Sequence, residues 1–169
     1  MNMDVYNYDL KDWSDYITGI VLMENEDWVL LHELPGDYQP DGYCLMNKSQ
    51  IVDRFKDEDA ELKERVLQLK GYEMELPQAL ILEDLDDMLR SIEKHYHVFG
   101  VQDEEDMIRI GTIQSIVANE LRLNFINTFG EMSEETPEPI FKTDIQTVTF
   151  GTDYLHSIYL LWKDQNEKS

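Results

Sequence analysis

The sequence predicts a mixed α+β fold in which two small β-barrels are joined by a two-helix connector and followed by a C-terminal helix. The first observation is an internal repeat, because a pattern of residues near the start of the chain returns in its second half. The second is that both copies consist of short apolar and β-branched runs separated by turn residues, as barrels of short strands do. The third is a change to helical spacing between and after the copies.

The repeat starts at Gly19, which corresponds to Gly111, and ends at Ile51, which corresponds to Ile145. The glycines are 92 residues apart and the isoleucines 94 apart, so the second copy is longer by two residues. A nearly constant spacing favours two copies of one module. Since about 60 residues can build only a marginal core, we expect the two modules to depend on each other.

Residues 1–56 are predicted to form the first barrel module. The run from Tyr16 to Met23 is apolar on both faces, and Gly19 within it marks a sharp bend of the strand. Trp28 begins the next apolar strand, and we assign its side chain to the core. Cys44 lies in a further apolar run and is expected to be a buried, unreactive thiol.

Residues 57–96 are predicted to be the helical connector, packed against one or both barrels. In its first helix, over 57–70, Leu62, Val66 and Leu69 share one face. Its second helix starts with acidic and ends with basic residues, which suits the helix dipole. That helix carries an apolar stripe made of Leu82, Leu85, Met88, Leu89, Ile92 and Tyr96.

Residues 97–169 are predicted to form the second barrel module with the C-terminal helix. This helix runs from about Asp153 to Lys163, with Tyr154, Ile158 and Leu161 on one apolar face and Leu155 and Trp162 beside it. The tail over 164–169 has no apolar residue to bury, so we expect it to be mobile.

The bent glycine strand, the polar turn before the next strand, and the tight turn at 142–145 together resemble the Sm-like, SH3-type small barrel. The segment 141–148 is similar to the last two strands of the bacterial Sm-class RNA chaperone. That family has an RNA-binding histidine where this chain has Ser49 and Thr143, and its eukaryotic members have an arginine-glycine pair that both copies lack. The resemblance therefore implies a fold, and it does not carry the RNA-binding residues.

Charge narrows the classes of partner. The chain has 36 acidic and 14 basic residues, which give a formal net charge of -22. A field of that sign repels phosphate backbones and anionic lipid, so we expect neither nucleic acid nor membrane as a partner. A basic protein surface would be attracted. The first ten residues lack the basic start and apolar run of a signal peptide, and no segment reaches the roughly 20 apolar residues of a membrane span, so we expect a cytoplasmic protein.

No motif in the chain specifies a reaction, and we expect no cofactor and no catalytic residues. His95 and His97 supply two metal ligands at most, whereas zinc sites need three or four. The acidic runs at 84–87 and 103–106 lack the ligand spacing and central glycine of an EF-hand, so no metal site is predicted.

These observations favour a non-catalytic protein-interaction module. Two alternatives stay open: an acidic inhibitor or immunity protein that neutralises a basic toxin or nuclease, and a small hydrolase or metal-dependent enzyme. Aromatic side chains at turns and a long acidic loop are the candidate contacts for a protein partner. The candidate interface residues are Trp13, Tyr38, Glu131, Glu134, Glu135 and Glu138.

Overall fold

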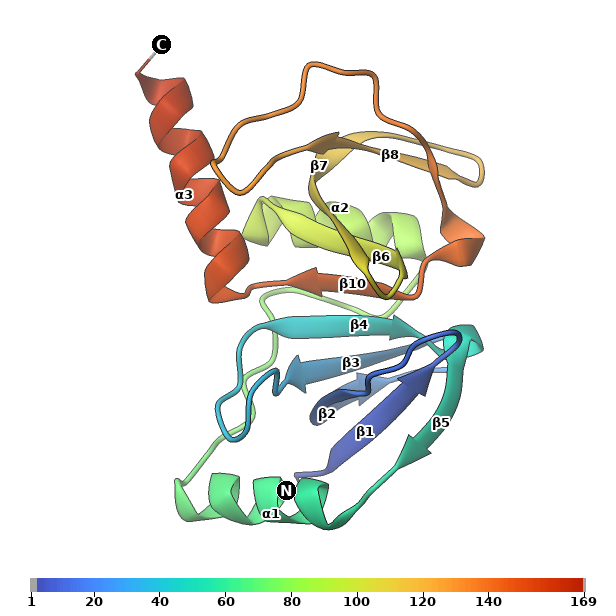
Figure 1. Cartoon of the computed structure of the whole chain (residues 1–169), viewed down its shortest axis with the longest axis vertical. Helices are drawn as coiled ribbons and strands as arrows, with labels where there is room; N and C mark the ends of the chain where they lie inside the picture. The colour runs from blue at the N-terminus through green and yellow to red at the C-terminus, as the bar shows by residue number, and fades with distance from the viewer. Residues whose placement is uncertain (1–2, 169) are drawn as a thin grey trace.

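The computed structural model describes residues 3–168, whose ten strands pair into one open antiparallel sheet (Figure 1). The order across the sheet is β5-β1-β2-β3-β4-β10-β6-β7-β8-β9. The strands are β1 (Val5–Leu10), β2 (Ile17–Glu24), β3 (Trp28–Glu33), β4 (Tyr43–Asn47), β5 (Ile51–Phe55), β6 (Phe99–Glu104), β7 (Met107–Val117), β8 (Glu120–Phe125), β9 (Ile140–Phe141) and β10 (Thr147–Phe150). The helices are α1 (Glu58–Leu69), α2 (Leu85–Tyr96) and α3 (Asp153–Glu167), and the two 3₁₀ turns are η1 (Lys48–Gln50) and η2 (Lys142–Asp144).

The prediction of two barrels joined by a two-helix connector is wrong, because the halves share a strand ladder. β4 pairs with β10 from Met46 opposite Thr147 to Tyr43 opposite Phe150. Both strands are almost wholly buried, so leaving either one as a free edge would expose apolar side chains and unpaired backbone groups. The two predicted connector helices also lie apart: α1 packs beside β1, whereas α2 packs on β6 and β7 (Figure 1).

The largest core cluster crosses this junction. Leu30 and Leu45 from the first half lie in one buried cluster with Val101 and Val148 from the second. Leu89 of α2 belongs to the same cluster and is fully buried. Burial of apolar surface in this cluster is therefore shared between the two halves of the chain.

Gly19 and Gly111 both lie in strands, as expected, and they occupy matching positions in β2 and β7. A Cβ at Gly19 would lie 2.8 Å from the carbonyl oxygen of His32, and one at Gly111 would lie 2.0 Å from that of Asn124. Shortly after each glycine the ladder to the next strand shifts register, between Val21 and Met23 in one case and between Ile113 and Ser115 in the other. These irregularities bend the long strands around the core.

The helix faces follow the sequence only in part. The stripe of α2 is confirmed for Met88, Leu89 and Ile92, which are buried, whereas Leu82 lies before the first residue of the helix. The predicted face of α1 is wrong: Leu62 is exposed, and Ala60, Lys63 and Leu67 are buried instead. In α3 the buried residues are Leu155 and Ile158, while Tyr154 and Leu161 are exposed, and the helix continues to Glu167 through most of the tail that we expected to be mobile. Burial of Trp28 and Cys44 is confirmed.

Candidate protein-interaction surface

The structure places the candidate interface residues in three separate regions. Trp13 lies in the β1–β2 loop at one end of the sheet, and Tyr38 lies in the β3–β4 loop. The four glutamates are together in the long segment between β8 and β9. No single surface therefore unites all six residues.

Trp13 makes a hydrogen bond that links the first half of the chain to the second. Its indole nitrogen donates to Gln146 Oε1 at 2.6 Å, and the amide nitrogen of Gln146 donates to the Lys11 carbonyl at 2.8 Å. Beside it, the Glu105 carboxylate accepts from the Ser14 and Asp15 backbone amides, and these hydrogen bonds lower its pKa. The loop is thus tied to the β6–β7 hairpin, and the half-buried Trp13 ring is part of that joint.

Tyr38 lies on the surface of the β3–β4 loop. Its side chain is 38% exposed, and its carbonyl oxygen accepts a hydrogen bond from Lys70 Nζ at 3.2 Å. Tyr38 lines none of five cavities that the described residues form, which include an apolar groove along β7.

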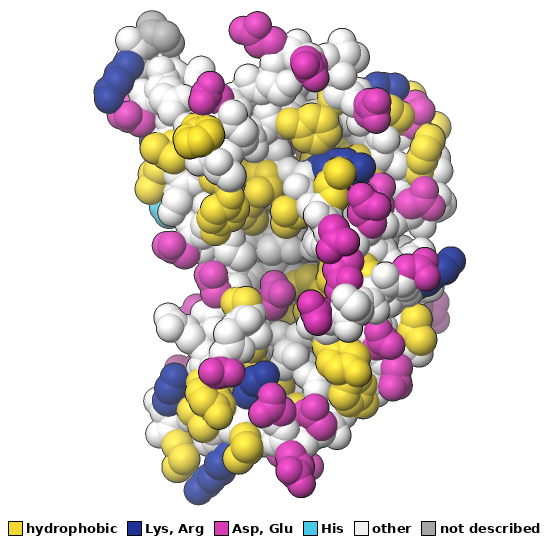
Figure 2. All heavy atoms as spheres, in the orientation of Figure 1, with side chains coloured by type: hydrophobic (Ala, Val, Ile, Leu, Met, Phe, Trp, Pro, Cys, Tyr) yellow, Lys and Arg dark blue, Asp and Glu magenta, His cyan; other side chains and the backbone are white. Residues whose placement is uncertain are grey.

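An apolar groove of about 790 Å³ lies along β7, between the β8–β9 segment and α3. We call it the β7 groove. Several apolar side chains of the groove are exposed to solvent: Tyr154 at 52%, Met107 at 46% and Ile108 at 43%. A partner that covered them would remove this apolar surface from water. In Figure 2 hydrophobic side chains are visible on both the upper and the lower half of the molecule, with Asp and Glu side chains between them.

The loop beside the β7 groove is held rigid by its own hydrogen bonds. The Asn127 side-chain oxygen accepts from the backbone amides of Phe129 at 2.9 Å and Glu131 at 3.0 Å. Gln165 of α3 donates to the Phe129 carbonyl at 2.7 Å. Gly130 adopts a φ of +75° and packs directly on α3, where a side chain would not fit.

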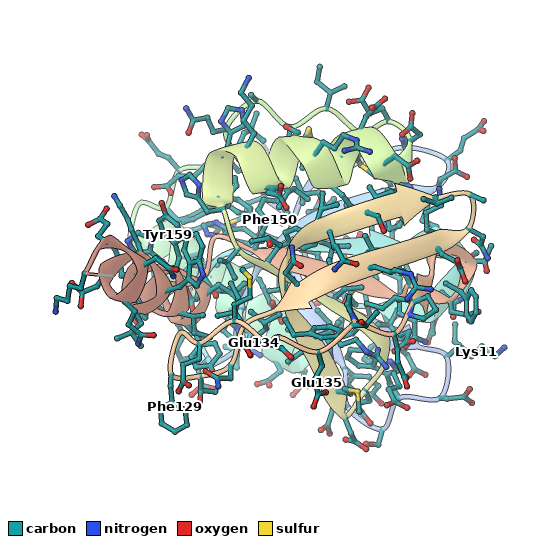
Figure 3. The ribbon with its side chains drawn as sticks, turned by 90° about the horizontal axis from the view of Figure 1, so that it is seen from above. Lys11, Phe129, Glu134, Glu135, Phe150 and Tyr159 are labelled. Atoms are coloured by element: carbon teal, nitrogen blue, oxygen red, sulfur yellow. The ribbon has the colours of Figure 1, made fainter. Side chains whose placement is uncertain are left out.

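This turn projects the Phe129 ring away from the protein (Figure 3). The ring is 68% exposed although the backbone that carries it is fixed at three points. A large aromatic side chain on a fixed backbone loses little entropy when a partner covers it.

Negative charge continues from the β7 groove along the same segment. Glu131, Glu134, Glu135 and Glu138 are all exposed, and none of them makes a salt bridge within residues 3–168. Arg122 fixes the segment by donating to the Pro137 carbonyl at 2.7 Å. The four carboxylates thus remain available to a cationic partner.

Sequence reasoning identified the glutamates and missed Phe129, Met107 and Ile108. The two β7 residues belong to an apolar strand that reads as core. Phe129 precedes Gly130, which signals a turn and does not show which way the ring points.

The described residues offer little for metal binding or nucleophilic catalysis. No group of three or more His, Cys, Asp or Glu side chains within residues 3–168 is placed to hold a metal ion. Cys44 is fully buried, and burial raises the pKa of its thiol well above the ordinary value, which disfavours the reactive thiolate. His32 lies in the interior, with its Nδ1 2.6 Å from the Tyr72 hydroxyl, and burial lowers its pKa.

Comparisons with protein-family models, curated proteins and solved structures find no match for this chain. Within residues 3–168, none of the helices combines the length and the apolar character needed to cross a bilayer.

Proposed function

We propose that this protein is a non-catalytic protein-interaction module whose partner presents a basic segment with apolar anchors. The observation that carries the proposal is the exposed Phe129 ring, held on a hydrogen-bonded turn beside the apolar β7 groove. Aromatic anchors and adjoining pockets dominate the energy of most protein interfaces.

The charge of the chain supports a basic partner. Glu131, Glu134, Glu135 and Glu138 stand next to the β7 groove without salt bridges inside the described chain. The net charge of -22 would speed the approach of a cationic surface over longer distances. We therefore assign affinity mainly to the apolar contacts and partner selection mainly to the carboxylates.

The test is a mapping experiment by NMR spectroscopy. A synthetic peptide of leucine and lysine is titrated into the labelled full chain, and the same peptide with glutamate in place of lysine serves as the comparison. We expect the basic peptide to shift the amide signals of Met107, Ile108 and Phe129, and the acidic peptide to shift none of them. Shifts spread evenly over the acidic surface would contradict a defined site.

Two variants make the mapping sharper. Phe129→Ser should weaken binding of the basic peptide by about tenfold or more, because it removes a large aromatic anchor. Glu134→Lys combined with Glu135→Lys should slow association. The matched control is Glu26→Lys combined with Glu73→Lys, which changes the net charge equally at exposed positions far from the loop in sequence. Equal weakening by the control would mean that only net charge matters.

A further inference from the structure

A second concave region, which we call the His97 cleft, lies between the C-terminal end of α2 and α3. Two cavities of about 360 and about 350 Å³ share His97, Val98 and Tyr159 as a common wall. Figure 3 shows Tyr159 reaching from α3 toward α2. Each cavity falls within the ~300–1,000 Å³ typical of small-molecule sites. The cleft shares no lining residue with the β7 groove.

The backbone at His97 is strained. Its φ of 69° and ψ of -57° form a γ-turn in which the Val98 amide donates to the Tyr96 carbonyl at 2.8 Å. This turn is rare for a residue with a side chain, and such strain persists mainly where surrounding contacts impose it at functional sites. Here it stacks the His97 ring on Tyr159, with ring centroids 4.3 Å apart and 10° between the planes.

The wall of the cleft is aromatic and its lip is cationic. Tyr159 also stacks near Trp162, with centroids 6.2 Å apart. Arg90 and Lys94 lie one helical turn apart on α2 and line the same cavity. Neither makes a salt bridge within the described residues, although Arg90 also faces Asp87.

Two further groups define the chemistry of the cleft. Glu93 brings a negative charge to the same cavity, but its carboxylate accepts a hydrogen bond from the Ile113 amide. Thr112 Oγ1 accepts from Asn124 Nδ2 at 3.2 Å, so its own proton is free to be donated to a ligand. His95 and His156 line the neighbouring cavity, which places three of the four histidines of the chain at this cleft.

We propose that the His97 cleft binds a small planar molecule that carries a carboxylate or phosphate group. Arg90 and Lys94 would hold the anion by charge-assisted hydrogen bonds, and Thr112 would donate a further one. The flat part of the ligand would contact the Tyr159 and Trp162 rings. In a chain of net charge -22, two cations without salt bridges beside an aromatic wall form a locally selective site.

The test is a titration of the full chain with phenyl phosphate, followed through the indole N–H signals in NMR spectra. The signal of Trp162 should shift with saturation, while those of Trp13 and Trp28, which do not line the cleft, should stay in place. Benzoate should produce the same pattern if the cleft accepts either a planar carboxylate or a planar phosphate, and a response to phenyl phosphate only would assign the site to phosphate. Inorganic phosphate has the anion without a planar ring, and benzyl alcohol has the ring without an anion. Each should bind at least tenfold more weakly than phenyl phosphate.

The matched variants are Arg90→Gln combined with Lys94→Gln, and Lys11→Gln combined with Arg65→Gln as the control. The first pair should weaken binding of phenyl phosphate at least tenfold, and the control pair should leave it unchanged. All four side chains are exposed, and the spectra report whether each variant is folded. Three results would each overturn the proposal: no Trp162 shift at millimolar phenyl phosphate, equal binding of inorganic phosphate, or equal weakening by the control. A basic peptide at the β7 groove would shift other signals, so this test is independent of the proposed function.

Discussion

Glu33 in β3 carries a carboxyl group whose surroundings in the fold change its protonation. Burial, and secondly the nearby Asp41 carboxylate, raise the pKa of Glu33 from 4.5 to about 7. The folded protein therefore holds this proton more tightly than the unfolded chain. Its contribution to stability is fully present below pH 4.5 and is lost as the pH rises to about 7. The loss amounts to at most about 3 kcal/mol.

We expect Glu33→Gln to be more stable than the parent protein at pH 8 and nearly equal to it below pH 4.5. Urea denaturation across this pH range measures the difference. Glu26→Gln, in the exposed β2–β3 turn, is the control and should track the parent protein at every pH. A stability difference for Glu33→Gln that does not vary with pH would show that the carboxyl group does not titrate in this range.

Among the elements, β7 depends on a single glycine. The carbonyl oxygen of Asn124, which would meet a Cβ on Gly111, belongs to the paired β8 ladder and cannot move without breaking it. Gly111→Ala should therefore lower the free energy of unfolding by about 2–3 kcal/mol. Gly36→Ala is the control, because a Cβ there would meet no atom within 4 Å. Urea denaturation of both variants tests this, and a Gly111→Ala protein as stable as the control would contradict the close approach.

Helix location was predictable from sequence, whereas the buried face was predictable only for α2. Its apolar stripe is continuous over the whole helix, so one face is distinguished without knowledge of the partner surface. In α1 the choice depends on the sheet: Ala60 and Leu67 join the cluster that contains Val5 of β1, and Lys63 is buried where Leu62 was expected. Tertiary contacts override local pattern in such weakly patterned helices.

At the scale of the whole molecule, the repeated strand pattern was readable and its assembly was not. The same apolar sequence in β4 suits the last strand of a closed barrel or a strand inside a larger sheet. The choice depends on pairing with β10, which lies about a hundred residues further along the chain, and no local pattern in β4 indicates that pairing. The acidic loop could be predicted from charge, but the β7 groove could not, because exposure of Met107 and Ile108 results from how the surrounding segments pack.

The shared core predicts that the two halves unfold together. Leu89 is fully buried in the cluster that joins Leu30 and Leu45 of the first half to Val101 of the second. Leu89→Asp would place an unpaired charge there, which costs about 3–5 kcal/mol and should unfold the whole chain in one transition. Leu62→Asp, at a position that is 54% exposed on α1, is the control and should leave stability nearly unchanged. Hydrogen exchange measures both halves separately: if Leu89→Asp removes protection from β6–β8 while β1–β4 stay protected, the β4–β10 ladder joins two independently stable units.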